Sequence, residues 1–399
     1  GYGEYFNDYG ADQPVDKIGQ DEILHEIFAE LPASNILWRP EVYLKDTVGF
    51  ISECKRAMLS PDNLRAIAKS NQAFIKTGSK ICSKQLAKLV RMDKTVLPLF
   101  ESLFVELQAN LSNDTLPGSL TPLDAMAVTS LAEALVAANE SGKTNTLTTW
   151  KNQWLQKNAD NQWVIAGTKE VNKLLGGADI YERYLKKLAT KKLFDYDDMI
   201  LRAIAGLETN AELRFSLQEQ YQYIMLDEFQ DTNLAQLKLI ELLTNNPASE
   251  GRPNILAVGD DDQAIFSFQG ADLTNMLRFH TMYRDVTTIT LTENWRSHAD
   301  ILELAGGVSE QIEERLHTRL GFAEKLLVAK NPNLPQKAHI ARHEFKSDVA
   351  QFGWIASNVD TLIKKGTNPA EIAILAPKHK YLEPLVPYLA NLGVPVRYD

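Results

Sequence analysis

Apolar residues recur every three or four positions through the first half of the chain, which is the spacing of amphipathic helices. Residues 21–31 (DEILHEIFAEL) show this pattern clearly. Further along, Ser60 is a good N-cap, Pro61 fits the first helical position and Asp62 suits the first turn, so a helix is predicted to begin there. We therefore predict a helical domain over residues 1–190.

The pattern changes after the segment FDYDDMI (residues 194–200), where short apolar, β-prone runs begin to alternate with helical segments. These runs are YIML, NILAVG, VTTITL, KAHIARHEF, EIAILAP and VPVRY. Strands that alternate with helices predict a mainly parallel sheet covered by helices. The fold class is therefore predicted to be α/β, preceded by the helical domain, and the Pro- and Asn-rich segment AKNPNLPQKA is a candidate internal junction.

Length and composition indicate a globular protein of two or three domains. The chain has 399 residues, of which 44% are hydrophobic and 24% charged. It has neither an apolar run long enough for a membrane span nor a charged-then-apolar leader, so we expect no membrane partner and a cytoplasmic location. The formal net charge of -10 argues against a uniformly basic surface for nucleic acid, although a local basic groove stays possible. Cys54 and Cys82 are expected to be free, buried thiols, not a disulfide or a metal site.

Two strand ends carry clusters of acids. Asp227 and Glu228 end the run YIML, and three acids end the run NILAVG, where Gly259 permits a tight exit and Gln263 adds an amide. Either cluster alone is compatible with a surface turn. Because open α/β sheets bind ligands at the carboxyl ends of their strands, two such ends about thirty residues apart predict one shared polar crevice.

A third predicted strand leads directly into Trp295 and Arg296. Arg296 has two interpretations: a structural ion pair, or a planar group of donors that stabilises charge on a phosphate. Trp295 is likewise either a core residue or a flat surface for a nucleobase.

These segments together resemble the UvrD/Rep-type superfamily 1 DNA helicases. LDEFQDTN is similar to the family's Walker B or DExx motif, VGDDDQAIFSFQGAD to its third motif and LTENWRSHADIL to its fourth, and FDYDDMI also matches. The resemblance implies RecA-like P-loop NTPase motor domains with a large all-helical insertion. Residues 1–190 would be that insertion, residues 191–292 the second half of the first motor domain, and residues 293–399 the start of the second.

The resemblance also implies roles for individual residues at an ATP site. Asp227 would hold Mg²⁺, and Glu228 would orient and deprotonate the attacking water. Gln263 would sense the γ-phosphate, Arg296 would act as an arginine finger, and Trp295 would stack on adenine. The implied cofactors are ATP and Mg²⁺.

Contacts with DNA are implied in two places. Phe266 and Phe268 match positions where aromatic rings meet single-stranded bases, with simple burial as the alternative. Gln269 replaces a frequent Arg, which weakens the expected contact. Lys186 and Lys187 belong to the lysine-rich segment KKLATKK, which is either a solvated helix face or a surface that follows phosphates.

A phosphate-binding loop, G-x-x-x-x-G-K-[ST], is missing. The nearest match, AANESGKT, has Ala137 at the first glycine position and follows a helical pattern instead of a strand. We therefore expect the chain to be a middle section of a longer helicase and to be inactive alone.

The expected function is that of an ATP-dependent DNA helicase or translocase, moving 3′ to 5′, with single-stranded DNA and duplex junctions as partners. The alternative is a nucleic-acid-binding module that has lost motor activity. Repair or recombination partners are not determined by the sequence.

Overall fold

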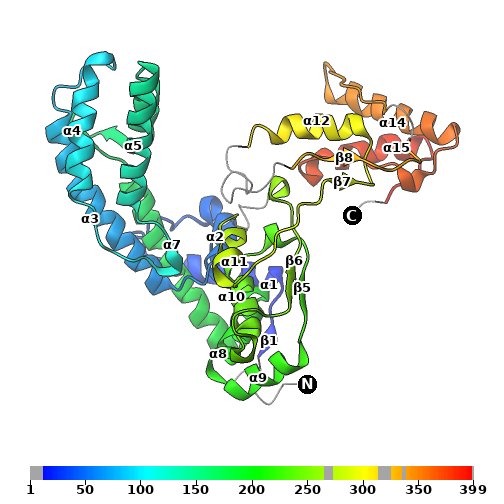
Figure 1. Cartoon of the computed structure of the whole chain (residues 1–399), viewed down its shortest axis with the longest axis horizontal. Coiled ribbons are helices and arrows are strands. Elements are labelled where there is room, and N and C mark those ends of the chain that lie inside the picture. The colour runs from blue at the N-terminus through cyan, green and yellow to red at the C-terminus, as the bar shows by residue number, and fades with distance from the viewer. Residues whose placement is uncertain (1–11, 265–272, 313–324, 335–337, 398–399) are drawn as a thin grey trace. The chain divides into compact units, whose positions relative to one another are not determined.

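The computed structural model describes residues 12–264, 273–312, 325–334 and 338–397, and the chain divides into two compact units (Figure 1). The first unit is built on residues up to 290, and the second on residues 291–311 and 325–399. None of the described helices combines the length and the apolar character needed to cross a bilayer.

Helices make up most of the first unit. They are α1 (Lys17–Ala29), α2 (Pro40–Arg56), α3 (Pro61–Gln85), α4 (Leu97–Gln108), α5 (Leu123–Ser141), α6 (Asn145–Trp154), α7 (Thr168–Lys191), α8 (Tyr196–Thr209), α9 (Ala211–Gln220), α10 (Leu234–Thr244) and α11 (Leu273–Met282). Its strands are β1 (Gln13–Pro14), β2 (Leu155–Lys157), β3 (Trp163–Ile165), β4 (Leu193–Phe194), β5 (Ile224–Leu226) and β6 (Ile255–Ala257).

The predicted start of α3 is confirmed. The Ser60 side chain accepts a hydrogen bond from the Asn63 N–H, and the Asn63 side chain accepts one in return from the Ser60 N–H. Pro61 occupies the first helical position, where no N–H is required. This reciprocal cap satisfies two backbone donors that a helix end would otherwise leave unpaired.

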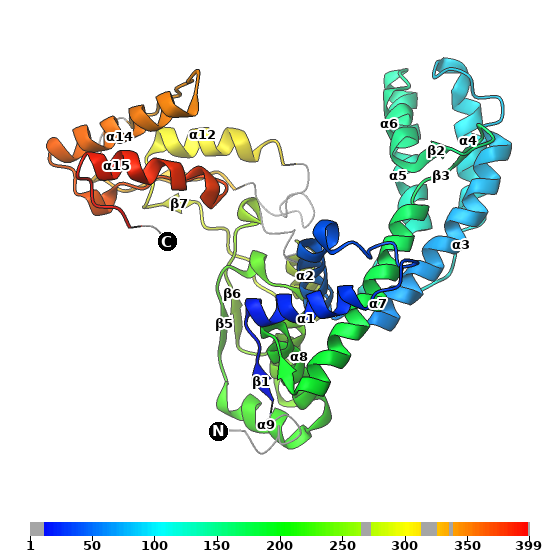
Figure 2. The same cartoon turned by 180° about the vertical axis from the view of Figure 1, so that it is seen from behind.

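The long helix α3 contributes to two separate hydrophobic cores. Its first turns place Leu64 in a core shared with α1, α2 and α7. Its last turns place Ile81 and Cys82 in a second core, which also contains residues of α4, α5, α6, β2 and β3. We call the end of α3 together with these elements the helical arm (Figure 2). Cys54, in the first of these cores, and Cys82 are both free and buried, as predicted, and burial raises the pKa of each thiol to about 12.

The helical arm also contains a β-hairpin, so the expectation of an all-helical insertion is wrong in this detail. Strands β2 and β3 pair antiparallel, with Leu155 opposite Ile165. The side chain of Asn158 accepts hydrogen bonds from the N–H groups of Asp160 and Gln162. Asn and Asp stabilise turns in this way, and a local signal for the hairpin was therefore present in the sequence.

A buried ion cluster joins α2 to α8. The ammonium group of Lys55 lies 2.6 Å from a carboxylate oxygen of Asp195 and 2.6 Å from one of Asp198, and its side chain is 0% exposed. The Tyr184 hydroxyl also donates to Asp195. Burial raises the pKa of the Asp198 carboxyl, although Lys55 acts in the opposite direction. This cluster attaches the start of the FDYDDMI segment to α2 and α7.

Parallel pairing, as predicted, joins β5 to β6. Met225 is opposite Leu256 in the register, and both side chains are exposed on one face. The flanking residues Ile224 and Leu226 are half-buried on the other face. The acidic segments after β5 and β6 therefore emerge at the same edge.

The second unit contains β7 (Glu293–Asn294), β8 (Val328–Ala329), α12 (Ala299–Ser309), α14 (Asp348–Lys364) and α15 (Val386–Asn391). Strands β7 and β8 pair in parallel. The predicted strands VTTITL and EIAILAP, and the described parts of KAHIARHEF and VPVRY, form none. A β-strand requires ladder hydrogen bonds to a neighbour, and no described segment supplies them there. A continuous multi-stranded sheet therefore stays a prediction.

Candidate functional site

The turn after β5 presents two carboxylates to solvent. Asp227 and Glu228 are both exposed, and the Glu228 N–H donates to Asp227 Oδ1 at 3.0 Å. Glu228 adopts a left-handed backbone conformation, with φ 48° and ψ 46°. Such a conformation is uncommon for a residue with a side chain, and residues of this kind cluster at functional sites.

A buried amide connects this turn to the next strand end. Gln230 is 2% exposed, and its Nε2 group donates to Glu228 Oε2 at 2.7 Å. Its Oε1 atom accepts from the Asp260 N–H at 3.0 Å. Gln230 therefore holds the Glu228 carboxylate from one side and the segment after β6 from the other. No role was assigned to it from the sequence, because its contact with Asp260 spans thirty residues.

The segment after β6 packs closely against Gln230. A Cβ atom at Gly259 would lie 2.8 Å from Gln230 Oε1, so any residue other than glycine would displace the Gln230 side chain. Asp260 then caps the 3-10 helix η6 (Asp261–Gln263), and its Oδ2 atom accepts from Gln263 Nε2 at 2.8 Å. A continuous hydrogen-bonded chain thus runs from Glu228 through Gln230 and Asp260 to Gln263. The two acidic strand ends therefore lie at the same edge of the β5–β6 pair, and the predicted polar crevice between them stays a prediction.

Aromatic and amide contacts with α11 hold this edge in place. Phe229 is buried, its N–H donates to the Val258 carbonyl at 2.9 Å, and its ring makes an edge contact with Phe279 at 5.5 Å between centroids. Asn275 of α11 donates to the Thr232 carbonyl at 2.7 Å. The side chains of Glu228, Gln230 and Asp260 are therefore held in place by packed neighbours, as a preorganised site requires.

The donor set fits magnesium held jointly with phosphates. Among the described residues no group of three or more His, Cys, Asp or Glu side chains could hold a metal ion by itself. Mg²⁺ does not require such a group, because it commonly binds through one or two carboxylates, several waters and substrate phosphates. The exposed Asp227 carboxylate offers that kind of ligand. Its assignment stays a prediction.

Trp295 and Arg296 lie in the second unit, immediately after β7. The Asn294 side chain accepts from the N–H groups of Arg296 and Ser297 at 3.0 and 2.7 Å, and Asn331 donates to the Trp295 carbonyl at 2.9 Å. Trp295 is 59% exposed, so the core interpretation does not apply to it here. The Arg296 guanidinium is exposed and has no carboxylate within 4.0 Å among the residues described, which disfavours a structural ion pair. The roles of both residues stay predictions.

Phe266, Phe268 and Gln269, the predicted aromatic and amide contacts with DNA, lie outside the described residues.

The predicted DNA-contacting lysines of α7 are engaged in ion pairs within the protein. Lys186 lies 2.5 Å from Glu182, and Lys187 lies 3.0 Å from both Glu26 of α1 and Glu30, the residue that follows α1. Lys186, and secondly Arg65, lower the pKa of Glu182 to about 2. These contacts agree with the interpretation of a solvated, ion-paired helix face, and the predicted phosphate contact stays untested.

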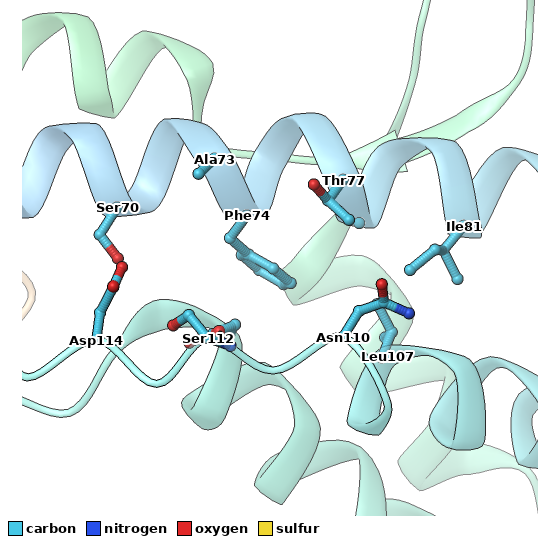
Figure 3. Close-up of a pocket in the computed structure, with 11 residues that line it drawn as sticks. Ser70, Ala73, Phe74, Thr77, Ile81, Leu107, Asn110, Ser112 and Asp114 are labelled. Atoms are coloured by element: carbon cyan, nitrogen blue, oxygen red, sulfur yellow. Dashed lines mark hydrogen bonds between the residues drawn. The ribbon is translucent and has the colours of Figure 1, made fainter.

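Two cavities were not predicted from the sequence. The first, of about 160 Å³, lies in the helical arm between Phe74 and Thr77 of α3 and the chain after α4 (Figure 3). Ser70 and Asp114 approach each other at its end, and the buried Asp124 carboxylate accepts from the Ser112 N–H at 2.7 Å. None of the predicted site residues lines this cavity.

The second cavity, of about 260 Å³, adjoins the DExx segment. It is lined by Asp231, Asn233 and Gln236 from that segment, and by Arg56 and Tyr196 among others. Arg56 and Tyr196 are 140 positions apart in sequence. Only the packing of α2 against α8 brings them to the same wall.

The UvrD/REP helicase N-terminal domain matches residues 53–284, more than half of the chain. The chain belongs to the UvrD/REP helicase family. The resemblance inferred from its motifs is therefore confirmed, and the match includes both acidic strand ends and the helical arm. It is consistent with the fold of a P-loop NTPase.

Individual relatives match over shorter segments. The chain is 38% identical over 138 residues to the ATP-dependent DNA helicase PcrA of Staphylococcus epidermidis, which is 35% of this chain and 18% of the relative. It is 37% identical over 153 residues to PcrA of Bacillus subtilis, covering 37% and 20% of the two chains. It is 34% identical over 191 residues to DNA helicase II of Rickettsia typhi, covering 47% and 28%. The chain spans less than a third of the length of these relatives.

Proposed function

We propose that this protein is an ATP-dependent DNA helicase or translocase, and that the edge formed by β5 and β6 is part of its ATP site. The observation that carries the proposal is the hydrogen-bonded chain from Glu228 through Gln230 and Asp260 to Gln263, at the carboxyl ends of two paired parallel strands. Ligands bind at this edge in open α/β sheets. The names of the matched relatives support ATP and DNA as the substrates.

Each residue at this edge has a distinct role in ATP hydrolysis. Asp227 holds Mg²⁺, which when bound neutralises charge on the nucleotide phosphates. Glu228 orients the attacking water and accepts its proton, and Gln230 restricts the Glu228 carboxylate to one orientation. Gln263 offers an exposed amide that hydrogen-bonds differently when the terminal phosphate is present or absent.

Residues of the second unit complete the proposal. The exposed guanidinium of Arg296, which has no carboxylate within 4.0 Å among the residues that the structure describes, stabilises the charge that develops on the transferred phosphoryl group. Trp295 offers its exposed indole to the adenine ring. Movement from 3′ to 5′, unwinding at duplex junctions and base stacking by Phe266 and Phe268 are further parts of the proposal.

The test is steady-state ATP hydrolysis by the complete gene product at saturating single-stranded DNA. Glu228→Gln keeps the size of the side chain but cannot accept a proton, and we expect kcat to fall by roughly 10²- to 10⁴-fold, the usual contribution of a general base. Nucleotide binding should persist.

Glu250→Gln is the matched control, because Glu250 is also exposed and left-handed, with φ 51°, but lies outside the site. Hydrolysis that survives Glu228→Gln would refute the assignment. DNA binding by the unmodified protein without any hydrolysis would instead support a binding module that has lost its motor.

A further inference from the structure

The cavity of the helical arm lies between α3 and the chain segment that connects α4 to α5 (Figure 3). Its volume is about 160 Å³. One water needs roughly 10 to 15 Å³, and sites for drug-sized ligands begin at about 300 Å³. The cavity is therefore of a size for a small molecule. The polar part of its lining consists of two carboxylates, Asp114 and Asp124, with hydroxyl and amide groups from neighbouring residues.

Asp124 brings a buried carboxylate to the wall of this cavity. It is 5% exposed, its Oδ1 atom accepts from the Ala125 N–H at 2.8 Å, and its Oδ2 atom accepts from the Ser112 N–H at 2.7 Å. An ionised carboxylate has about four acceptor sites, so each oxygen can accept a further hydrogen bond. None of the described Lys, Arg or His side chains pairs with Asp124.

A second aspartate of the chain provides a comparison at equal burial. Asp195 is also 5% exposed, and the ammonium group of Lys55 lies 2.6 Å from its Oδ2 atom. A buried charge is costly unless an opposite charge and hydrogen bonds compensate it. Asp124 has the backbone donors but not the cation. An ammonium group in the cavity would give Asp124 what Lys55 gives to Asp195.

The cavity also has an aromatic wall. The Phe74 ring extends from α3 towards the segment after α4 (Figure 3). A Cβ atom at Gly78 would lie 3.1 Å from Phe74 Cε2 and 2.9 Å from Ile165 Cγ1, so the ring packs closely against the helix where glycine leaves room. An aromatic face attracts cations and also packs against an alkyl chain. At one end of the cavity, Ser70 and the second carboxylate, Asp114, approach each other (Figure 3).

We propose that this cavity binds a small organic ammonium ion, a primary amine on a short apolar chain. The ammonium group carries three donors and no acceptor, which suits the free acceptor sites of Asp124. The apolar chain packs against Phe74 and Leu107. A bare metal ion does not fit, because among the described residues no group of three or more His, Cys, Asp or Glu could hold one. The inference goes beyond the proposed function and does not depend on it.

The experiment measures the binding of butylammonium chloride to the complete gene product by saturation-transfer NMR, with 1-butanol as a neutral probe of similar size. Ala73→Leu places a larger side chain in the cavity and keeps every charge. Ala66→Leu is its control, because Ala66 is also exposed on α3 but does not line the cavity. Asp124→Asn removes the charge and keeps an acceptor for the Ser112 N–H, and Glu101→Gln, at an exposed acid of α4, is its control.

We expect Asp124→Asn to weaken butylammonium binding by about 10- to 100-fold, the usual contribution of a hydrogen bond to a charged group. Ala73→Leu should weaken it by at least about tenfold, and the two controls should change it little. The melting temperature should rise with butylammonium concentration in the unmodified protein and in Ala66→Leu, but not in Ala73→Leu. If Asp124→Asn does not fold, the comparison of the two leucine variants decides.

Three results would overturn the inference. Equal binding by Ala73→Leu and Ala66→Leu would show a general attraction of cations to the acidic chain. Equal binding of 1-butanol and butylammonium would show an apolar cavity without selectivity for charge. No binding by the unmodified protein would show that the backbone donors at the start of α5 compensate Asp124 by themselves. Each of these results would leave the proposed function intact, because none of the predicted site residues lines the cavity.

Discussion

Replacing Gln230 tests the connection between the two acidic strand ends. Gln230→Leu removes the amide that donates to Glu228 and accepts from the Asp260 N–H. Gln230→Glu keeps the shape and the acceptor but replaces the donor by a second carboxyl group beside Glu228. The two variants therefore separate the loss of hydrogen bonds from the introduction of charge.

The structure sets the expected size of each effect. In Gln230→Leu the partly buried Asp260 N–H loses its acceptor, which lowers the free energy of unfolding by about 1 to 3 kcal/mol. The exposed Glu228 carboxylate can bind water in place of the lost amide, so the loss of that hydrogen bond lowers it by only about 0.5 to 1.5 kcal/mol. We expect a total of about 1.5 to 4.5 kcal/mol, independent of pH. We also expect kcat to fall roughly 10- to 100-fold because Glu228 loses its orientation.

Gln230→Glu should instead depend on pH. Burial and the neighbouring Glu228 raise the pKa of a carboxyl group at this position above its unfolded value of about 4.3. Below that pH the protonated side chain replaces the amide as a donor, and stability should be near that of the unmodified protein. Stability should then fall as pH rises, by about 1.4 kcal/mol for each unit of pKa shift.

The assays are urea unfolding followed by circular dichroism between pH 4 and 8, and DNA-stimulated ATP hydrolysis. Gln218→Leu is the matched control, because Gln218 is also buried and its amide donates to the Leu242 and Asn245 carbonyls, away from the site. Both leucine variants should lose stability, but only Gln230→Leu should lose activity. Equal activity in the two variants, or a pH-independent cost of Gln230→Glu, would refute the reasoning.

Three further predictions concern other parts of the chain. Arg296→Lys in the complete gene product should lower kcat about a hundredfold or more while melting and nucleotide binding change little; intact kcat with a lowered melting temperature would make Arg296 structural. Lys55→Met leaves buried carboxylates without their cation and should cost about 3 to 5 kcal/mol in urea unfolding; adding Asp195→Asn should restore part of that, and no restoration would contradict the ion-pair explanation. Burial raises the pKa of Cys54 and Cys82 from 9.0 to about 12, so a thiol reagent at pH 8 should react with them only when the protein unfolds. The free energy of unfolding should also fall as pH rises from 9 towards 12. Rapid labelling of the folded protein would contradict this.

Several features of this protein were already determined by local sequence. The α3 start at Ser60 needs only a cap, a proline and helical spacing within a few residues. The acids at Asp227 and Glu228 follow a short apolar strand, and the order of three motifs was sufficient to identify the family. The helix start and the acidic strand end are readable because each depends on neighbours within one turn or one strand, and the family is readable because each motif is a short continuous segment.

Other features were decided only by the tertiary structure. Gln230 acquires its role from Asp260, thirty residues away, and Lys187 is neutralised by Glu26, 161 residues away. Lysines at KKLATKK and lysines near the hairpin look alike in sequence. Packing of α1 nevertheless brings Glu26 to Lys187 and Lys191, and no described element brings a carboxylate within 4.0 Å of Lys151 or Lys157. Whether a charged side chain is neutralised depends on the groups within a few ångströms of it, and the packing of distant segments determines which groups those are.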